Sequence, residues 1–446
     1  MHYFTQKNGQ LFAEQVAIAT LAQAIGTPFY CYSAATLRHS YRLFAKALQS
    51  LDATICYSVK ANANLSVLAV LGAEGAGADI VSEGELRRAS AAGIAPEKIV
   101  FSGIGKTAAE IIAGLQANIA FFNVESAAEL VLISQLAEQE NKTARIAVRV
   151  NPDIDAGTHA KITTGKAETK FGIAWEDAEA IFAQAAALPN ITACGLDIHI
   201  GSQITDLAPF RAAFDKTRTL LIQLRKQGHK IDYLDLGGGL GVSYESAAQA
   251  TEAAQAAQPT DAPTLQPPTP QDYASLIAEQ FGDMGCHIFI EPGRVIAGHA
   301  GILVTSVIRT KKSKARNFII VDAAMTELLR PALYGAYHHI APINSPTKTD
   351  KGAELVWDIV GPVCETSDFL GLDRRLIEPQ AGDLFAIFTA GAYGAVLGSD
   401  YNSRLRAPEI IVDGAQYALT RPRPTYDALL AQETIAHWLP KPTRKK

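Results

Sequence analysis

Two hydrophobic patterns alternate along the chain from about residue 33 to residue 298. Segments with the 3.6-residue period of a helix are separated by short apolar, β-branched runs that are typical of buried strands. The predicted helices cover residues 34–50, 63–72, 83–92, 107–117, 126–139, 175–188, 207–227 and 272–284. The predicted strands cover residues 54–59, 77–81, 98–101, 118–122, 145–150, 194–199, 231–236 and 286–290. This strict alternation, with a helix first, favours a closed (β/α)8 (TIM) barrel, and a doubly wound open sheet is the alternative.

The helical alternation stops near residue 300, and strand-like runs follow. They cover residues 302–309, 318–322, 355–360, 384–389, 409–412 and 416–420. The first thirty or so residues contain apolar positions around an Asn8-Gly9 turn, so we expect a hairpin that joins this part. The sequence therefore predicts a barrel over 33–298 and a β-sandwich or β-barrel domain made of 1–32 plus 299–446.

One segment interrupts the predicted barrel between its seventh strand and its last helix. Residues 245–271 are rich in Ala, Gln, Thr and Pro and contain almost no large apolar side chain. Such a segment cannot bury a core. We expect a mobile surface insert and assign it no function.

Composition excludes several classes of protein. The 446 residues carry 45 acidic and 40 basic side chains, a net charge of −5, with no long basic run except the short tail Arg444-Lys445-Lys446. This mild charge argues against nucleic acid and anionic membranes as partners. No signal-peptide pattern and no membrane-spanning apolar run occurs, so a cytoplasmic protein is expected. Five scattered cysteines without a CxxC pair suggest neither a disulfide framework nor a metal site.

Polar residues gather just beyond the predicted strands. The C-terminal ends of the strands form the active-site face of such a barrel. The residues in these positions are Lys60, Asp79, Ser82, Ser102, Asn123, Glu125, Asn151, Asp153, His199, Gly201, Ser202, the glycines 237–239, Glu291, Gly293 and Arg294.

Lys60 ends the first predicted strand of the barrel, Thr54-Ile55-Cys56-Tyr57-Ser58-Val59. Burial at the mouth of an apolar core can lower the pKa of an amine, and the free base can form a Schiff base with a carbonyl cofactor. A lone lysine is more often a solvated strand end. The interpretation of Lys60 as a nucleophile therefore depends on the residues around it.

Two further motifs suggest the cofactor. The run Gly237-Gly238-Gly239-Leu240-Gly241 follows the seventh strand, where backbone amides of a barrel often bind phosphate, although it could be a simple tight turn. Glu291 ends the eighth strand and could keep a pyridine nitrogen protonated, or else pair with Arg294. A lysine, a phosphate cradle and a carboxylate on one rim together imply pyridoxal phosphate.

Several motifs in order along residues 28–415 resemble one family. They are YSVKAN at 57–62, GADIVSEGEL at 77–86, HIGSQ at 199–203, the triple glycine, and EPGR at 291–294. The chain resembles the alanine-racemase-fold, pyridoxal-phosphate-dependent decarboxylases, and within them the diaminopimelate decarboxylases. The runs TTG at 163–165, KFGI at 170–173 and RPALY at 330–334 are similar to that subgroup.

The resemblance implies a role for each matching residue. Lys60 would bind the cofactor covalently beside Asp79, His199 would stack on its ring, and Glu291 would pair with the ring nitrogen. The phosphate would be held by Ser202, Gly238, Gly239, the backbone of Pro292, Gly293 and Arg294, and the hydroxyl of Tyr393.

Cys364-Glu365, after Gly361-Pro362-Val363, matches a pair that the family donates across a dimer interface. Taken alone, such a cysteine would be structural. The resemblance makes Cys364 the acid that protonates the carbanion once CO2 has left. It also implies a homodimer with two shared active sites.

Charge suggests the substrate. Diaminopimelate carries both an ammonium and a carboxylate at its far end. Glu365 can pair with the ammonium, Arg294 and Arg330 with the carboxylate, and Tyr334 and Tyr393 can add hydrogen bonds. We therefore expect removal of the carboxylate at the D-centre of meso-diaminopimelate, giving L-lysine. The stereochemistry rests on the resemblance.

Three alternatives remain at this point. A related decarboxylase of arginine, ornithine or a carboxylated polyamine would leave buried arginines unpaired. A non-catalytic homologue that binds a partner protein could dispense with Lys60 or Cys364, yet both are present. An amino-acid racemase would use the same barrel and cofactor, but the 364–365 and 164–165 segments fit it poorly.

Overall fold

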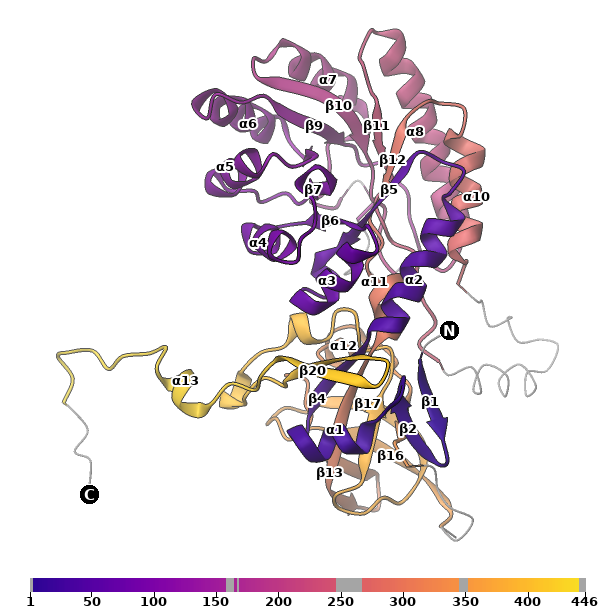
Figure 1. Ribbon diagram of the computed structural model, residues 1–446, viewed down its shortest axis with the longest axis vertical. Coiled ribbons are helices and arrows are strands. Elements are labelled where there is room, and N and C mark those ends of the chain that lie inside the picture. The colour runs from indigo at the N-terminus through magenta and orange to yellow at the C-terminus, as the bar shows by residue number, and fades with distance from the viewer. Residues whose placement is uncertain (1–2, 158–163, 167, 246–266, 345–351, 441–446) are drawn as a thin grey trace.

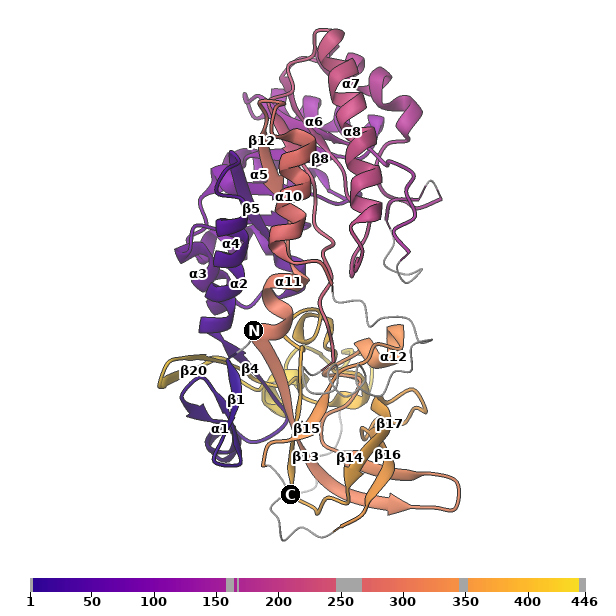
Figure 2. The ribbon, with the colours of Figure 1, turned by 90° about the vertical axis from the view of Figure 1, so that its right-hand side faces the viewer.

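The computed structural model describes residues 3–157, 164–166, 168–245, 267–344 and 352–440. They form a helix-covered barrel and a second, mostly sheet part that lies beneath it in Figures 1 and 2. Thr163, the basic end at 444–446 and most of the predicted insert, residues 246–266, lie outside the described residues. Among the described helices, none combines the length and the apolar character needed to cross a membrane.

Eight parallel strands close into the barrel. They are β5 (Ala53–Ser58), β6 (Gly77–Ile80), β7 (Ile99–Phe101), β8 (Phe121–Val124), β9 (Ala144–Arg149), β10 (Ile191–Asp197), β11 (Tyr233–Asp235) and β12 (His287–Ile290). The last strand pairs with the first, with Phe289 opposite Thr54. This closure confirms the predicted barrel and excludes the open sheet.

Among the described residues, eight outer helices cover the barrel. They are α2 (Ala34–Ala47), α3 (Leu65–Ala73), α4 (Glu83–Ala91), α5 (Ala108–Ala117), α6 (Ala127–Gln139), α7 (Ala178–Ala187), α8 (Ala208–Lys226) and α10 (Pro270–Phe281). All but α7 and α8 begin at a Ser, Thr or Asn whose side chain accepts a backbone N–H. Thr107 and Glu110 form a capping box at the start of α5, and Thr269 and Asp272 form one at α10. Each box satisfies backbone N–H groups that have no partner within the helix.

Aromatic side chains fill part of the barrel interior. The rings of Phe121 and Phe289 meet edge to face with centroids 4.9 Å apart, and Tyr233 packs beside both. Val100, Ala147 and Cys56 belong to the same buried cluster. The interior is therefore a packed core, which leaves the rim as the place for a ligand.

The second part is built around one long strand. Gly301–Lys312 (β13) pairs with β4 (Phe29–Ser33) and β18 (Leu384–Ile387) through its first half and with β14 (Asn317–Val321) through its second. The other strands are β15 (Ile340–Pro342), β16 (Glu354–Val360), β17 (Phe369–Ile377), β19 (Glu409–Asp413) and β20 (Gln416–Arg421). β4, β15 and β17 were not predicted as strands. β4 is buried at all five positions, β15 has only three residues, and β17 has an irregular burial pattern, so none shows a clear alternation.

The N-terminal segment joins this second part, as predicted. Strands β1 (Phe4–Lys7), β2 (Gln10–Ala13) and β3 (Val16–Ala17) form the expected hairpin and its extension, followed by α1 (Ile18–Ile25). Their apolar side chains share one core with β13 and β19. The chain therefore starts in the second part, enters the barrel through α2, and returns through β13.

We propose that the two domains are residues 33–298 and residues 1–32 plus 299–446. Ser33 both ends β4 and caps α2, so the sheet of one domain passes directly into the first helix of the other. At the second crossing, the short helix α11 (Arg294–Ala297) and one 3-10 turn separate β12 from β13. These tight crossings support a fixed arrangement of the two domains.

Candidate active site

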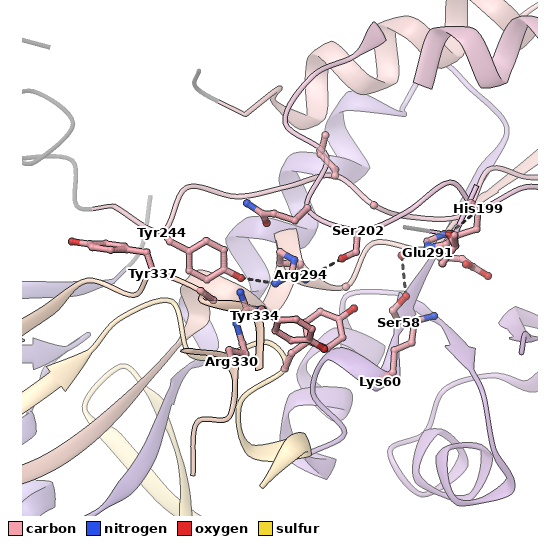
Figure 3. Close-up of a pocket in the computed structure, with 17 residues that line it drawn as sticks. Ser58, Lys60, His199, Ser202, Tyr244, Glu291, Arg294, Arg330, Tyr334 and Tyr337 are labelled. Atoms are coloured by element: carbon pink, nitrogen blue, oxygen red, sulfur yellow. Dashed lines mark hydrogen bonds between the residues drawn. The ribbon is translucent and has the colours of Figure 1, made fainter. Parts of the chain in front are cut away.

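Only some of the residues predicted at the rim meet in one site at the C-terminal ends of the barrel strands. Lys60, His199, Ser202, Gly239, Glu291, Gly293 and Arg294 line it, whereas Ser82, Glu125, Asn151 and Asp153 do not. A cavity of about 390 Å³ opens there, between the barrel and the second domain. Figure 3 shows Lys60, Ser58, Glu291 and His199 on one side of it, and Arg294, Arg330 and three tyrosines on the other. The lining also includes Thr164, Ser202, Gln203, Gly239, Leu240, Gly293, Ala336 and Tyr393.

Lys60 lies in the 3-10 turn that follows β5, and its amine forms an ion pair with Asp79. The Nζ to Oδ2 distance is 2.6 Å, and Asp79, in β6, is fully buried. Burial alone would lower the pKa of Lys60, but the nearby carboxylates of Asp79 and Glu291 outweigh it and raise that pKa above its ordinary value. The predicted lowering of the Lys60 pKa is therefore wrong, because the sequence did not reveal how close these carboxylates lie.

Glu291 is buried directly beyond β12. Its Oε1 accepts a hydrogen bond from the Ser102 hydroxyl at 3.1 Å, and the Asn123 amide lies 3.0 Å from the same hydroxyl. Burial, together with the carboxylates of Asp235 and Asp79, raises the pKa of Glu291 well above its ordinary range. The alternative ion pair between Glu291 and Arg294 does not form, since Arg294 bonds to Tyr244 and Ser202 instead.

More acidic side chains lie beneath Glu291. Burial and the neighbouring carboxylate of Asp197 together raise the pKa of Asp235 to about 8. Arg149 is the buried cation of this layer, with Nη1 2.9 Å from Glu125 and Nε 3.8 Å from Asp197. One oxygen each of Asp79 and Asp197 has no hydrogen-bond partner among the described residues. The floor of the cavity therefore favours an added positive charge.

His199 and the glycine-rich loop form one unit. The N–H of Gly238 donates to Nδ1 of His199 at 3.1 Å, and burial lowers the pKa of His199 well below its usual value, so the ring is neutral. A Cβ at Gly238 would lie 2.2 Å from the carbonyl oxygen of Glu291. Gly239 has a φ of +111°, and a Cβ there would lie 2.6 Å from the carbonyl oxygen of Gly201. Only glycine fits this loop against its neighbours.

Two arginines lie on the opposite side of the cavity. Arg294, at the start of α11, donates to the hydroxyls of Tyr244 and Ser202 at 2.5 Å and 3.0 Å. Arg330, at the start of α12 (Arg330–Tyr334), donates from Nε to His338 at 3.2 Å. Both side chains are buried, and among the described residues neither forms an ion pair with a carboxylate. An anionic ligand would supply the missing charge.

Tyr393 closes the cavity from the second domain. Its ring lies 4.7 Å from the Arg294 guanidinium, and its N–H donates to the carbonyl of Ala61 at 2.7 Å. Its φ is +55°, a conformation that a non-glycine residue adopts at a cost. Such a cost is typical of a residue fixed for function. Tyr334 also lines the cavity, with its ring 6.0 Å from Arg330.

Cys364 and Glu365 are the predicted site residues that the single chain does not bring to the cavity. They follow β16, and both are exposed. The Cys364 N–H donates to Asn402, and Glu365 accepts from Ser367 at 2.9 Å. The other four cysteines are buried and unpaired, as expected for packing residues.

Sequence reasoning missed several residues of the site. Tyr244, His338 and Ser58 contact predicted residues, and Arg149 and Asp235 form the charged floor. Arg149 and Asp235 lie near the C-terminal ends of predicted strands, so their position could have identified them as residues of the site. The sequence carried no such signal for Tyr244 and His338. Tyr244 contacts Arg294, 50 positions away in the chain, and His338 contacts Arg330, 8 positions away.

Comparison with known proteins gives a consistent result. The family model described as "Pyridoxal-dependent decarboxylase, pyridoxal binding domain" matches residues 34–298. Diaminopimelate decarboxylase of Vibrio cholerae is 45% identical over 437 residues, covering 98% of this chain and 99% of the relative. The Aquifex aeolicus enzyme is 44% identical over 428 residues, 96% of each chain. A crystal structure of the M. jannaschii diaminopimelate decarboxylase with L-lysine superposes with a TM-score of 0.88 at 34% identity, covering 97% and 98% of the two chains.

The raised pKa of Asp235 generates a pH prediction. The pKa lies near 8 in the folded protein and near 4 in an unfolded chain. The stability contributed by the bound proton is therefore complete below about pH 4 and is lost as the pH rises through about 8. We expect Asp235→Asn to gain stability relative to the unchanged protein as the pH rises from about 5 to about 8.5.

Denaturant unfolding of the cofactor-free protein at several pH values measures this difference. Asp215→Asn, at an exposed position of α8, is the matched control and should show no such trend. A stability difference for Asp235→Asn that stays constant or shrinks with rising pH would contradict the assignment.

Proposed function

From the premise that the chain belongs to the diaminopimelate decarboxylases, a branch of the pyridoxal-dependent decarboxylases, we propose which residues carry out each part of its reaction. The chain uses pyridoxal phosphate and converts diaminopimelate to lysine and CO2, a step of lysine biosynthesis. The finer choice of the D-centre of meso-diaminopimelate is part of the proposal.

The residues present fit the cofactor. The glycine loop leaves room where any side chain would clash, and the acidic floor under Glu291 favours a protonated ring nitrogen. Pyridoxal phosphate, when bound, supplies an electron sink for the carbanion that a departing carboxylate leaves. The residues proposed to hold it are Lys60, Asp79, His199, Ser202, Gly238, Gly239, Glu291, Pro292, Gly293, Arg294 and Tyr393.

Asp79 is the proposed acceptor of the proton that the Lys60 amine must lose. With its pKa raised, the amine is an ammonium and must lose a proton before it can act as a nucleophile. Asp79 Oδ2, 2.6 Å away, is placed to accept that proton, and the Ser58 hydroxyl 2.8 Å from the same oxygen fixes the carboxylate. Asp79 is thus proposed to act as the base that deprotonates the Lys60 ammonium.

The pair of buried arginines carries the substrate assignment. Arg294 and Arg330 lack a carboxylate partner among the described residues, so a ligand with a carboxylate at its far end would remove an electrostatic penalty. Ornithine, lysine and arginine have a cation at that end and would increase the penalty. Tyr334 and Tyr393 are proposed as further substrate contacts, and Glu365 as the partner of the distal ammonium.

The exposure of Cys364 and Glu365 supports a homodimer. Both lie outside the cavity of their own chain, although the family resemblance implies that they belong to an active site. We propose that two copies share their sites, so that Cys364 of the partner subunit gives a proton to the carbon that loses CO2. Five unpaired cysteines support the proposed cytoplasmic location.

Substrate specificity tests the function directly. The purified protein with added pyridoxal phosphate should release CO2 from meso-diaminopimelate roughly 10²-fold or more faster than from lysine, ornithine or arginine. The product should be L-lysine by chiral chromatography, and LL-diaminopimelate should be inert. A preference for a basic amino acid would refute the charge argument for the two arginines.

Mixing two inactive variants tests the shared site. Cys364→Ala should retain the cofactor and slow turnover by roughly 10²-fold or more, and Lys60→Ala should be inactive. Mixed dimers hold one intact site, so subunit exchange at equal concentrations should restore about one quarter of full activity by random pairing. Cys31→Ala, at a buried cysteine outside the cavity, is the control. It should be active by itself, and mixing it with Lys60→Ala should add no activity. Absence of recovery would show that each site is built from one chain.

A further inference from the structure

Tyr244 contacts both arginines of the cavity. Its hydroxyl accepts the hydrogen bond from Nη1 of Arg294 at 2.5 Å, and its ring lies 4.8 Å from the Arg330 guanidinium. Figure 3 shows Tyr244 beside Arg294, with Arg330 below them. The face of an aromatic ring attracts a cation, so one side chain fixes the relative position of two like charges.

His338 holds Arg330 from the other side. The imidazole is fully buried, and its Nδ1 lies 2.9 Å from the carbonyl oxygen of Phe388. Because that oxygen only accepts, Nδ1 carries the proton and Nε2 accepts from Nε of Arg330 at 3.2 Å. Tyr244 packs edge to face on the same imidazole, with ring centroids 5.0 Å apart.

The His338 ring is neutral at neutral pH. Burial and the positive charge of Arg330 together lower the pKa of His338 to about 3. A protonated ring would have no acceptor for Arg330 and would place a third positive charge beside two arginines. The neutral ring instead accepts the hydrogen bond from Nε of Arg330. The ligand would then be bound by the Nη groups of this arginine.

We propose that Tyr244 and His338 are positioning residues that fix the Arg330 guanidinium for the distal carboxylate of the substrate and thereby set the preference for substrates that carry one. The inference rests on the proposed function. Its physical basis is that a bidentate arginine–carboxylate pair needs a fixed plane, and a loose guanidinium loses that geometry. Arg294 also bonds to Tyr244 and to Ser202, so among these contacts the hydrogen bond from His338 is the one that acts on Arg330 alone.

The test compares ligands with and without the distal carboxylate. For the holoenzyme of each variant, KM and kcat are measured with meso-diaminopimelate, and the inhibition constant is measured for 1,5-diaminopentane, which carries no carboxylate. Bound pyridoxal phosphate and the melting temperature report on folding. We expect His338→Leu and Tyr244→Leu to raise KM for diaminopimelate about 10-fold or more, with a smaller change in kcat and less than about a 3-fold change in the inhibition constant of 1,5-diaminopentane.

Conservative variants separate positioning from bulk packing. In His338→Gln the amide oxygen can still accept from Arg330, so KM should return to within about 3-fold of the unchanged enzyme. Tyr244→Phe keeps the ring against Arg330 and should lie between the unchanged enzyme and Tyr244→Leu. His287→Leu, at the opposite end of β12, is the matched control and should leave both ligands unaffected.

Equal losses of affinity for diaminopimelate and 1,5-diaminopentane, or unchanged KM in both leucine variants, would overturn the inference. If His338→Leu does not fold, Tyr244→Leu and the glutamine variant still decide it. An unchanged enzyme that releases no CO2 from diaminopimelate would instead refute the proposed function. The two failures are therefore distinguishable.

Discussion

The ion pair between Lys60 and Asp79 is the interaction on which the rest of the site depends. It places a protonated amine at the mouth of a barrel whose floor holds more buried carboxylates than cations. Acidic groups in this position cannot all ionise, so Asp235 and Glu291 retain protons until a positive group arrives. The same excess of acid that keeps Lys60 charged also prepares the site for a cationic ring nitrogen.

The two sides of the cavity have opposite electrostatic character. The barrel contributes Asp79 and Glu291, whereas Arg330 comes from the second domain and Arg294 from the short helix that leads into it. A ligand with charges of both signs at each end fits such a cavity only when the two domains are held together. The direct passage of β4 into α2 and of β12 through α11 into β13 provides that rigidity.

Much of this arrangement could be predicted from the sequence because it is local. The alternation predicted every barrel strand, and the C-terminal ends of these strands pointed to Lys60, Asp79, His199 and Glu291. Properties set by distant contacts were not predictable. The pKa of Lys60 rises because of Asp79 and Glu291, and Tyr244 is recruited by Arg294, 50 positions later in the chain. The hydrophobic periodicity of a sequence does not reveal contacts between side chains that are far apart in the chain.

Covalent trapping of the cofactor tests the central claim most directly. The protein is loaded with pyridoxal phosphate, reduced with borohydride, digested, and mapped by mass spectrometry. The account predicts one modified peptide, with the cofactor on Lys60, while Lys106, a buried lysine paired with Glu129, stays unmodified. Modification of a different lysine, or a bound cofactor that reduction leaves unattached, would contradict the role given to Lys60 and to the charges around it.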